Sequence, residues 1–437
     1  MSLKDKASLI FKPSRYKAGT AYSFRGTDFT FTRASTATRI NSAGNIEEVA
    51  SGVPRLNYDG TDLTKEPVIL LEPQSTNYLT DSNTGGFGST DVANAISLTK
   101  NGIEGISRSD AGGGNPRIYL NVAMALGFNV FSFYVDLDTI TSYLDIRLGI
   151  DGNASTGLRL YLYKDTATIS TPTIYNTSNV YSGSEFATLE QVNGSIYRVT
   201  LGGNFAAGTN IFPVIYFGAG AAGAWIGGGQ IERRNKASSL IKTSGSTATR
   251  SFDIAKKTSA SSVIGQSEGT IYVEFEYTGV KEAYSPLFSL QGVASPMELI
   301  EIYSGPNSSV YSAVMQDGGV TQFNNGFTPS IGKNKVAFAY ATNNSVLVAN
   351  GKVIGAVDTA CTIPTLYDIG LGSFTYSSSY SLGDSINEAL LFKQRLSAEE
   401  LASLTSFDDY EELVDAKGLT WESSTITNNR LSELAAL

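Results

Sequence analysis

The side chains that this sequence offers for chemistry form a narrow set. Its 437 residues include no histidine and a single cysteine. A Ser-His-Asp triad, a Cys-His pair and a histidine general base are therefore excluded. A zinc site of the usual Cys/His kind and an intrachain disulfide are excluded for the same reason. Catalysis by two carboxylates is the enzymatic chemistry that remains open.

Acidic residues two positions apart are the candidates for that chemistry. Asp136 with Asp138, and Glu274 with Glu276, would each share one face of a strand, about 7 Å apart. This separation suits a glycosidase, but it is also the ordinary appearance of the solvent face of an alternating strand. We therefore expect that the chain is not an enzyme, and Glu274 with Glu276 is the pair to test first.

Aromatic side chains provide a second kind of candidate site, because a ring can pack against the C–H face of a sugar. The stretch 374–380 predicts a surface loop in which Phe374, Tyr376 and Tyr380 contact a ligand. The alternative is a strand end whose rings are partly core. Trp225 is a further candidate binding residue, with a core or interface anchor as its alternative.

These residues belong to a chain dominated by short alternating strands. Segments 128–135, 158–163 and 270–277 are rich in Tyr, Phe, Val and Ile at strand spacing, and Gly, Asn, Ser and Asp clusters separate such segments. Strands do not alternate with helical segments, which disfavours a parallel α/β sheet. The predicted fold class is all-β, with two antiparallel β-sandwich domains of the jelly-roll type.

Changes in composition along the chain divide it into regions. Ser397 and Glu400 form the pattern of a capping box, which predicts the clearest helix start in the sequence. The predicted regions are an N-terminal attachment or oligomerisation region (1–75), a first β-sandwich (76–255), a second β-sandwich (256–404) and a short helical C-terminal tail (405–437).

Charge and hydropathy limit the partners. Lys and Arg number 32 against 41 Asp and Glu, which gives a net charge of −9. With no basic block, nucleic acid is not an expected partner. No stretch approaches the roughly 20 apolar residues of a membrane span, and the first residues lack the apolar region of a secretory signal. We expect no membrane span and no organic cofactor.

Several spaced motifs resemble the signatures of tailed-bacteriophage fibre and structural proteins. In that family an opening and a closing signature bracket a carbohydrate-binding-module-like β-sandwich, and residues 194–199 fit a strand motif of that module. The opening signature is carried by residues 31–47, 53–58 and 70–77, and the closing signature by 230–232, 238–243 and 249–250.

The second sandwich resembles the laminin-G/concanavalin-A-like jelly roll. The resemblance is carried by residues 383–388 and 396–401. Members of that family often bind glycans, and some bind calcium. The resemblance therefore allows a calcium ion, for which Asp384 is the candidate metal ligand by its position in the motif. The alternative for Asp384 is a turn aspartate that precedes a strand.

The resemblances together predict a non-enzymatic phage virion fibre or decoration protein, located in the virion. The N-terminal region would contact other virion proteins, and the sandwiches would bind host-surface glycan or protein. Phage fibres are generally homotrimers, so a homotrimer is implied. Two alternatives stay open: a carboxylate-dependent polysaccharide depolymerase of the tailspike type, and a purely structural head or tail fibre spacer.

Overall fold

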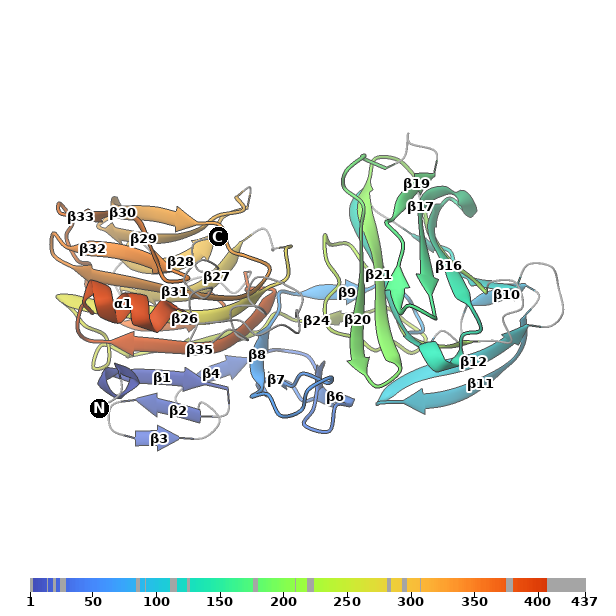
Figure 1. Ribbon diagram of the computed structural model, residues 1–437, viewed down its shortest axis with the longest axis horizontal. Coiled ribbons are helices and arrows are strands. Elements are labelled where there is room, and N and C mark those ends of the chain that lie inside the picture. Colours follow the sequence, from blue (N-terminus) through green and yellow to red (C-terminus); the bar gives the residue numbers. More distant parts are fainter. Residues whose placement is uncertain are drawn as a thin grey trace, which may run out of the picture.

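The computed structural model describes most of the chain between residues 3 and 406. The described ranges are 3–13, 15–18, 21–23, 29–83, 87–90, 92–110, 116–123, 126–175, 180–208, 210–217, 224–280, 284–292, 297–306, 308–374 and 380–406. Almost all regular structure in these ranges is antiparallel β-strand, so the predicted all-β fold class is confirmed. Figure 1 shows two sandwiches side by side, with β9 and β24 between them.

The first sandwich consists of two sheets, which we name after one of their strands. The β15 sheet contains, in spatial order, β11 (Val92–Lys100), β12 (Ile103–Asp110), β23 (Ala224–Glu232), β15 (Gly127–Asp136), β21 (Ile196–Phe205) and β20 (Phe186–Asn193). The β16 sheet contains β10 (Gly88–Thr90), β13 (Arg117–Tyr119), β22 (Asn210–Phe217), β16 (Tyr143–Ile150), β17 (Asn153–Tyr163) and β18 (Thr168–Ile169), with β14 (Val122–Ala123) beside β22 and β19 (Thr173–Tyr175) beside β17. The short 3-10 helix η2 (Leu137–Thr139) follows β15.

Alternation along these strands builds the core of the first sandwich. Phe131 and Phe133 of β15 lie in one buried cluster with Ile146 and Leu148 of β16 and Leu160 of β17. Every second side chain of each strand points into this cluster, because successive strand residues face opposite sides of a sheet. Each such fully buried side chain contributes about 1.5–3 kcal/mol. The residues between them must therefore form the outer faces.

The second sandwich is built in the same way. The β26 sheet contains, in order, β3 (Ala21–Ser23), β2 (Arg15–Ala18), β1 (Leu9–Lys12), β35 (Asp384–Phe392), β26 (Glu268–Tyr277), β31 (Gly332–Ala341), β32 (Ser345–Ala349) and β33 (Lys352–Asp358), with β8 (Val68–Leu71) beside β35 and β7 (Leu56–Asn57) beside β8. The β28 sheet contains β30 (Val320–Phe327), β29 (Tyr311–Asp317), β28 (Leu299–Ser304), β27 (Ser285–Gln291), β34 (Asp368–Leu371), β25 (Ile254–Lys257) and β4 (Thr30–Thr32).

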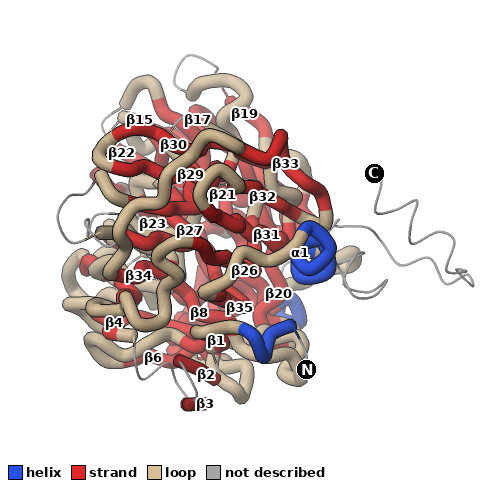
Figure 2. Tube along the Cα trace, turned by 90° about the vertical axis from the view of Figure 1, so that its left-hand side faces the viewer, coloured by secondary structure: helices blue, strands red, loops and turns tan. Residues whose placement is uncertain are grey.

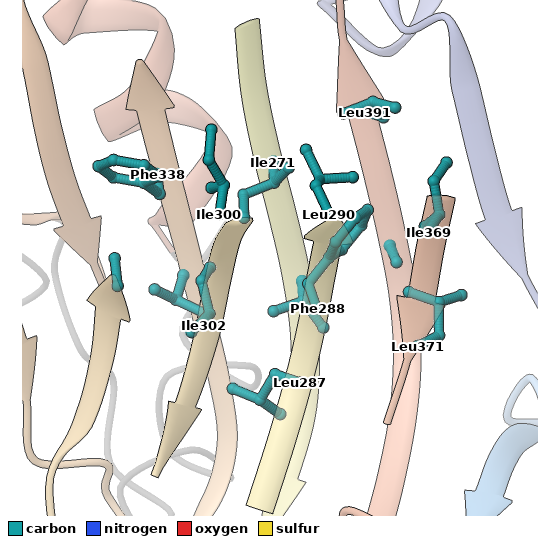
Figure 3. Packing of buried hydrophobic residues seen from close by; sticks show 14 of the residues in the cluster. Ile271, Leu287, Phe288, Leu290, Ile300, Ile302, Phe338, Ile369, Leu371 and Leu391 are labelled. Carbon is teal, nitrogen blue, oxygen red and sulfur yellow. The ribbon is translucent and has the colours of Figure 1, made fainter. Parts of the chain in front are cut away.

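Figure 3 shows the interior of this second sandwich. Ile271 and Leu391 of the β26 sheet pack in one cluster with Phe288, Ile300 and Leu371 of the β28 sheet, and all five are fully buried. The outer face of the β26 sheet is covered in part by helix α1 (Ala398–Thr405), which Figure 2 shows beside β31. The predicted capping box of α1 is confirmed, with reciprocal hydrogen bonds between Ser397 and Glu400.

Residues 1–75 supply strands to both sheets of the second sandwich. After the 3-10 helix η1 (Leu3–Lys6), β1 pairs with β35, and β4 pairs with β25. The hairpin of β5 (Ala37–Ile40) and β6 (Ile46–Val49) follows, and β9 (Ser75–Asn77) pairs with β24 (Ala248–Arg250). The region predicted as an attachment unit is thus part of the second sandwich and of the connection between the sandwiches, and its attachment role stays a prediction.

A network of buried charges lies where these connections meet. We call it the junction network, made of Arg33, Arg55, Glu72, Arg250 and Asp253. Arg55 donates to Glu72 at 2.7 Å and also to Asp253, Arg33 donates to Asp253 at 2.9 Å, and Arg250 lies 2.9 Å from Glu72. Although burial opposes ionisation, Arg250 and Arg55 hold the pKa of Glu72 well below its usual range.

Within the described ranges, no helix is long and apolar enough to cross a membrane.

Candidate functional site

The outer face of the β16 sheet gathers arginine and tyrosine side chains. Leu144, Ile146 and Leu148 of β16 point into the core, so the residues between them point outward. The same alternation holds on β17, where Leu158, Leu160 and Leu162 are buried. We call this surface the Arg–Tyr face, and it carries Arg117, Tyr119, Tyr143, Asp145, Arg147, Arg159, Tyr161, Tyr163, Tyr175 and Tyr216.

Two arginines share one aspartate at the centre of the Arg–Tyr face. Arg147 and Arg159 stand opposite each other on β16 and β17. Each reaches Asp145 with a guanidinium nitrogen at 2.7 Å from Oδ2. Burial opposes the charge of both arginines, but their hydrogen bonds to Asp145 outweigh it and raise the pKa of each. Both guanidinium groups therefore stay charged at every physiological pH.

Tyrosine rings hold the two guanidinium groups in place. The guanidinium carbon of Arg147 lies 4.4 Å from the ring centre of Tyr216, and that of Arg159 lies 4.3 Å from the ring centre of Tyr161. Tyr175 lies within 6 Å of both arginines, at 5.9 Å and 5.3 Å, and its hydroxyl accepts a hydrogen bond from Arg159. Stacking of this kind fixes the planes of the cations toward solvent.

The charge of this surface differs from that of the chain. Three arginines against one aspartate leave two positive charges on the Arg–Tyr face, while the whole chain carries −9. Arg147 and Arg159 keep 17% and 20% of their side chains exposed, and Tyr163 is 43% exposed. Asp145 takes the Nε and Nη2 edge of both arginines, so an anionic group would be bound by their remaining Nη N–H groups, with an apolar surface packed against the rings beside them.

The sequence contained part of the signal for this site. Tyr143, Asp145 and Arg147, and likewise Arg159, Tyr161 and Tyr163, alternate with leucine or isoleucine, which is visible in the sequence. The alternation predicts a strand over 158–163 but does not by itself assign a site to it. What the sequence could not show is that β16 lies between β17 and β22, which is what brings the two arginines and Tyr216 together.

Two of the predicted aromatic residues, Phe374 and Tyr380, come together on the second sandwich. Their ring centres lie 6.2 Å apart, and Tyr284 and Tyr303 join them, with Tyr284 at 4.6 Å from Tyr380. Phe374 is buried, which matches the alternative of a strand end with core aromatics, while Tyr380 is 37% exposed. Tyr376 lies outside the described residues. The role of this cluster in binding stays a prediction.

Trp225, the remaining candidate binding residue, does not lie at the surface. Its side chain is completely buried among Ile103, Tyr134 and Leu240, and its indole N–H donates to the carbonyl oxygen of Leu98 at 2.8 Å. A fully buried indole with its one donor satisfied has no atom left for a ligand. Trp225 is therefore a core anchor, which was the alternative to binding.

Asp384, the candidate calcium ligand, is engaged by a cation from the protein itself. The ammonium group of Lys236 lies 2.5 Å from Asp384 Oδ1, and Thr278 donates to the same oxygen at 3.1 Å. In the part of the chain that the structure describes, no group of three or more acidic, histidine or cysteine side chains could hold a metal ion. Calcium binding stays a prediction, at a position where Lys236 already supplies the positive charge.

The carboxylate pair of β26 also lies among cations. Glu274 has the ammonium groups of Lys333 and Lys335 at 4.0 Å each, and the hydroxyl of Tyr272 donates to it at 3.3 Å. Burial raises the pKa of Glu276, although Lys333 acts in the opposite direction. The two carboxylates thus have unequal environments.

Comparison with protein-family models gives no match, and comparison with curated proteins gives none either. Solved structures give several distant likenesses. The CBM40 module of an IT-sialidase from Ruminococcus gnavus has a TM-score of 0.29 at 20% identity, over 34% of this chain and 88% of that chain. A leech intramolecular trans-sialidase has a TM-score of 0.29 at 20% identity, over 35% of this chain and 25% of that chain. A sialidase from Trypanosoma rangeli has a TM-score of 0.29 at 9% identity, over 72% of this chain and 62% of that chain.

These findings correct two predictions. The similar structures are carbohydrate-binding modules and sialidases rather than virion proteins, so the prediction of a phage virion fibre or decoration protein is wrong. The prediction that the chain is not an enzyme is corrected as well, since the similar structures include sialidases. The depolymerase and spacer alternatives gain no support. At a TM-score of 0.29 these likenesses assign no activity to this chain.

A carbohydrate-binding-module-like β-sandwich is the part of the resemblance that the comparisons support. The laminin-G/concanavalin-A-like assignment of the second sandwich, the homotrimer and the virion localisation are tested by none of these observations, and they stay predictions.

Proposed function

We propose that this chain is a glycan-binding protein whose Arg–Tyr face binds an acidic saccharide. The observation that carries the proposal is the pair Arg147 and Arg159, which flank Asp145 on an outer sheet face and stack on tyrosine rings. The Nη N–H groups of this pair that Asp145 does not engage can donate to a carboxylate or sulfate group.

The tyrosines support a saccharide in particular. Tyr161 and Tyr163 stack 6.2 Å apart on β17, and Tyr143 lies 5.8 Å from Tyr161 on the neighbouring strand. A row of rings beside a cationic centre offers C–H contacts to the apolar face of a sugar and hydroxyls to its polar edge. Gly149 and Gly157 stand opposite each other on the same face and add no side chain next to the arginines.

Titration of the purified chain with anionic and neutral sugars tests this proposal. Sialyllactose and a sulfated disaccharide are the anionic probes, and lactose is the neutral one. We expect saturable binding of an anionic probe that weakens at high salt, because charge contributes to it. Arg147→Ala should weaken it about tenfold or more, since a hydrogen bond to a charged group is worth about 1.5–3 kcal/mol.

Arg233→Ala is the matched control for Arg147→Ala. Arg233 is an exposed arginine of the first sandwich that also stacks on a tyrosine, at 4.1 Å from the ring of Tyr78, but it follows β23 of the other sheet. This variant should bind the anionic probe as the unmodified chain does. Equal losses in the two variants, or no binding of either anionic probe by the unmodified chain, would overturn the proposal.

A further inference from the structure

A cavity of about 340 Å³ lies between the two sandwiches, on the side opposite to the Arg–Tyr face. Its first wall is the outer face of the β15 sheet, at Thr188 and Glu190 of β20 and Arg198 of β21. The second wall comes from the second sandwich, and the connection 236–240 and part of the N-terminal region complete it. Its volume lies in the range of small-molecule sites. We call it the junction pocket.

The second sandwich and the connection 236–240 together present polar groups that satisfy one another. The ammonium group of Lys236 pairs with Asp384 at 2.5 Å and donates to the hydroxyl of Thr278 at 3.0 Å. The side chains of Lys236 and Asp384 are only 13% and 2% exposed, so the pair is largely removed from water. Glu276 lies beside this set and also lines the pocket. The wall thus offers donors and acceptors without a strong net charge.

The wall of the first sandwich has a similar mixture. Arg198 is buried and donates to the hydroxyl of Ser132 at 2.9 Å and to the carbonyl of Ser238 at 2.6 Å. Its Nε–H finds no hydrogen-bond partner among the described residues. Glu190 stands opposite Arg198 in the register of β20 and β21, and the hydroxyl of Thr188 donates to Glu190 at 3.3 Å.

The mixture of acidic and basic side chains around the junction pocket determines which kind of ligand can bind there. An anion would face Glu190, Glu276 and Asp384, and a cation would face Arg198 and Lys236. A sugar hydroxyl can donate and accept at once, so a neutral ligand rich in hydroxyls can satisfy both kinds of group. Apolar side chains between the polar ones, such as Phe186, provide contact area for the C–H face of a ring.

We propose that the junction pocket binds a neutral saccharide of about one or two rings, at a site separate from the Arg–Tyr face. A ligand there contacts both sandwiches at once. Because it binds only when the two walls are in place, it stabilises their arrangement and raises the unfolding temperature of the chain.

Ligand-observed NMR with saturation transfer tests this proposal on the full chain. Lactose, maltose and cellobiose serve as probes at about 10 mM, a concentration at which millimolar affinities are detected. We expect at least one probe to bind. Thr188→Trp should weaken that binding by about tenfold or more, because the indole fills the pocket from an exposed position on a strand at the sheet edge. Arg147→Ala should leave it unchanged, which separates it from binding on the Arg–Tyr face.

Gln191→Trp is the matched control for Thr188→Trp. Gln191 is exposed on the same strand, but it does not line the pocket. A milder pair of variants covers the case in which the indole disturbs folding. Glu190→Gln should weaken binding about threefold or more, and Glu104→Gln, at an exposed position on β12, should not. No binding of any probe, or equal effects within either pair of variants, would overturn the proposal.

Discussion

Glu301 is a buried carboxyl group that has no cationic partner among the described residues. It lies on β28 with 2% of its surface exposed, and the hydroxyl of Ser289 donates to it at 2.9 Å. Burial raises the pKa of Glu301 from its ordinary value of 4.5 to about 7. Glu72 is equally buried, but arginines surround it, and its pKa moves in the opposite direction.

The raised pKa makes stability depend on pH. The folded state favours the protonated form of Glu301, so this group's contribution to stability is complete below about pH 4.5 and is lost as the pH rises to about 7. Glu301→Gln keeps a neutral group there at every pH. The free energy of unfolding of the unmodified chain relative to this variant should therefore fall by about 3 kcal/mol between about pH 5 and pH 8.

Urea unfolding of both chains at the two pH values measures this difference. Glu298→Gln is a suitable control, because Glu298 precedes the same strand and is partly exposed. Parallel pH dependence of the unmodified chain and Glu301→Gln would mean that the folded state does not raise the pKa of Glu301.

Individual residues also show what the sequence could predict and what it could not. Arg33, Arg55 and Glu72 each belong to one of the three opening motifs, and Arg250 belongs to the closing one. The motifs were recognised as separate segments, and the structure brings their charged residues into the junction network. Their spacing does not contain this information, because the partners lie up to 220 positions apart.

At the scale of elements, β1 is an integral strand of the second sandwich. Leu9 pairs with Leu391 and Phe11 with Ala389. Phe11 is 2% exposed and packs edge-on against Phe29, with ring centres 5.4 Å apart. The N-terminal region therefore contributes side chains to the core that β26, β27 and β28 share.

Phe11→Ala tests this contribution. Removal of a fully buried phenylalanine ring should lower the free energy of unfolding by about 3–5 kcal/mol, through lost burial and the cavity it leaves. Phe128→Ala is the matched control, because Phe128 is 38% exposed on β15 and should cost much less. Thermal or urea unfolding measures both. A loss of less than about 1 kcal/mol for Phe11→Ala would mean that β1 is not part of the folded core.

The sequence predicts the positions of strands and of the helix better than it predicts which strands pair. The strands predicted at 128–135 and 270–277 lie within β15 and β26, and the helix start at Ser397 is confirmed. Alternation and capping are local, so the sequence contains them. The pairing of β1 with β35 and of β4 with β25 is not local, and it explains why residues 1–75 were predicted as a separate region.

At the scale of the whole molecule, the junction network joins the segments that lead into and out of the first sandwich. Glu72 accepts from Arg55, from the backbone N–H of Ser239 and from its hydroxyl, at 2.7, 2.8 and 2.6 Å. Asp253 accepts from Arg33 and Arg55. Each buried charge in this network depends on a partner from another segment.

Arg55→Ala should therefore destabilise the connection strongly. Removal of one partner leaves Glu72 and Asp253 buried with less compensation, which costs about 3–5 kcal/mol. Arg39→Ala is the control, since Arg39 pairs with Glu47 at 2.6 Å on the surface and such a pair contributes about 1 kcal/mol or less. Differential scanning calorimetry should show a lower transition temperature for Arg55→Ala, with the unfolding of the two sandwiches more widely separated. Equal shifts in both variants would contradict a role for the network.

The pairing of β1 with β35 also has a consequence for the order of folding. The strands of the first sandwich, from β10 to β23, follow one another without interruption, whereas the second sandwich combines strands from before and after them. During synthesis the first sandwich can therefore close as soon as β23 emerges. The pairing of β1 with β35, in which Leu9 stands opposite Leu391, cannot form until the C-terminal part of the chain has been synthesised. Until then β1 is an unpaired edge, and contacts of such long sequence separation form slowly. The interval between these two events is when the chain is most exposed to aggregation.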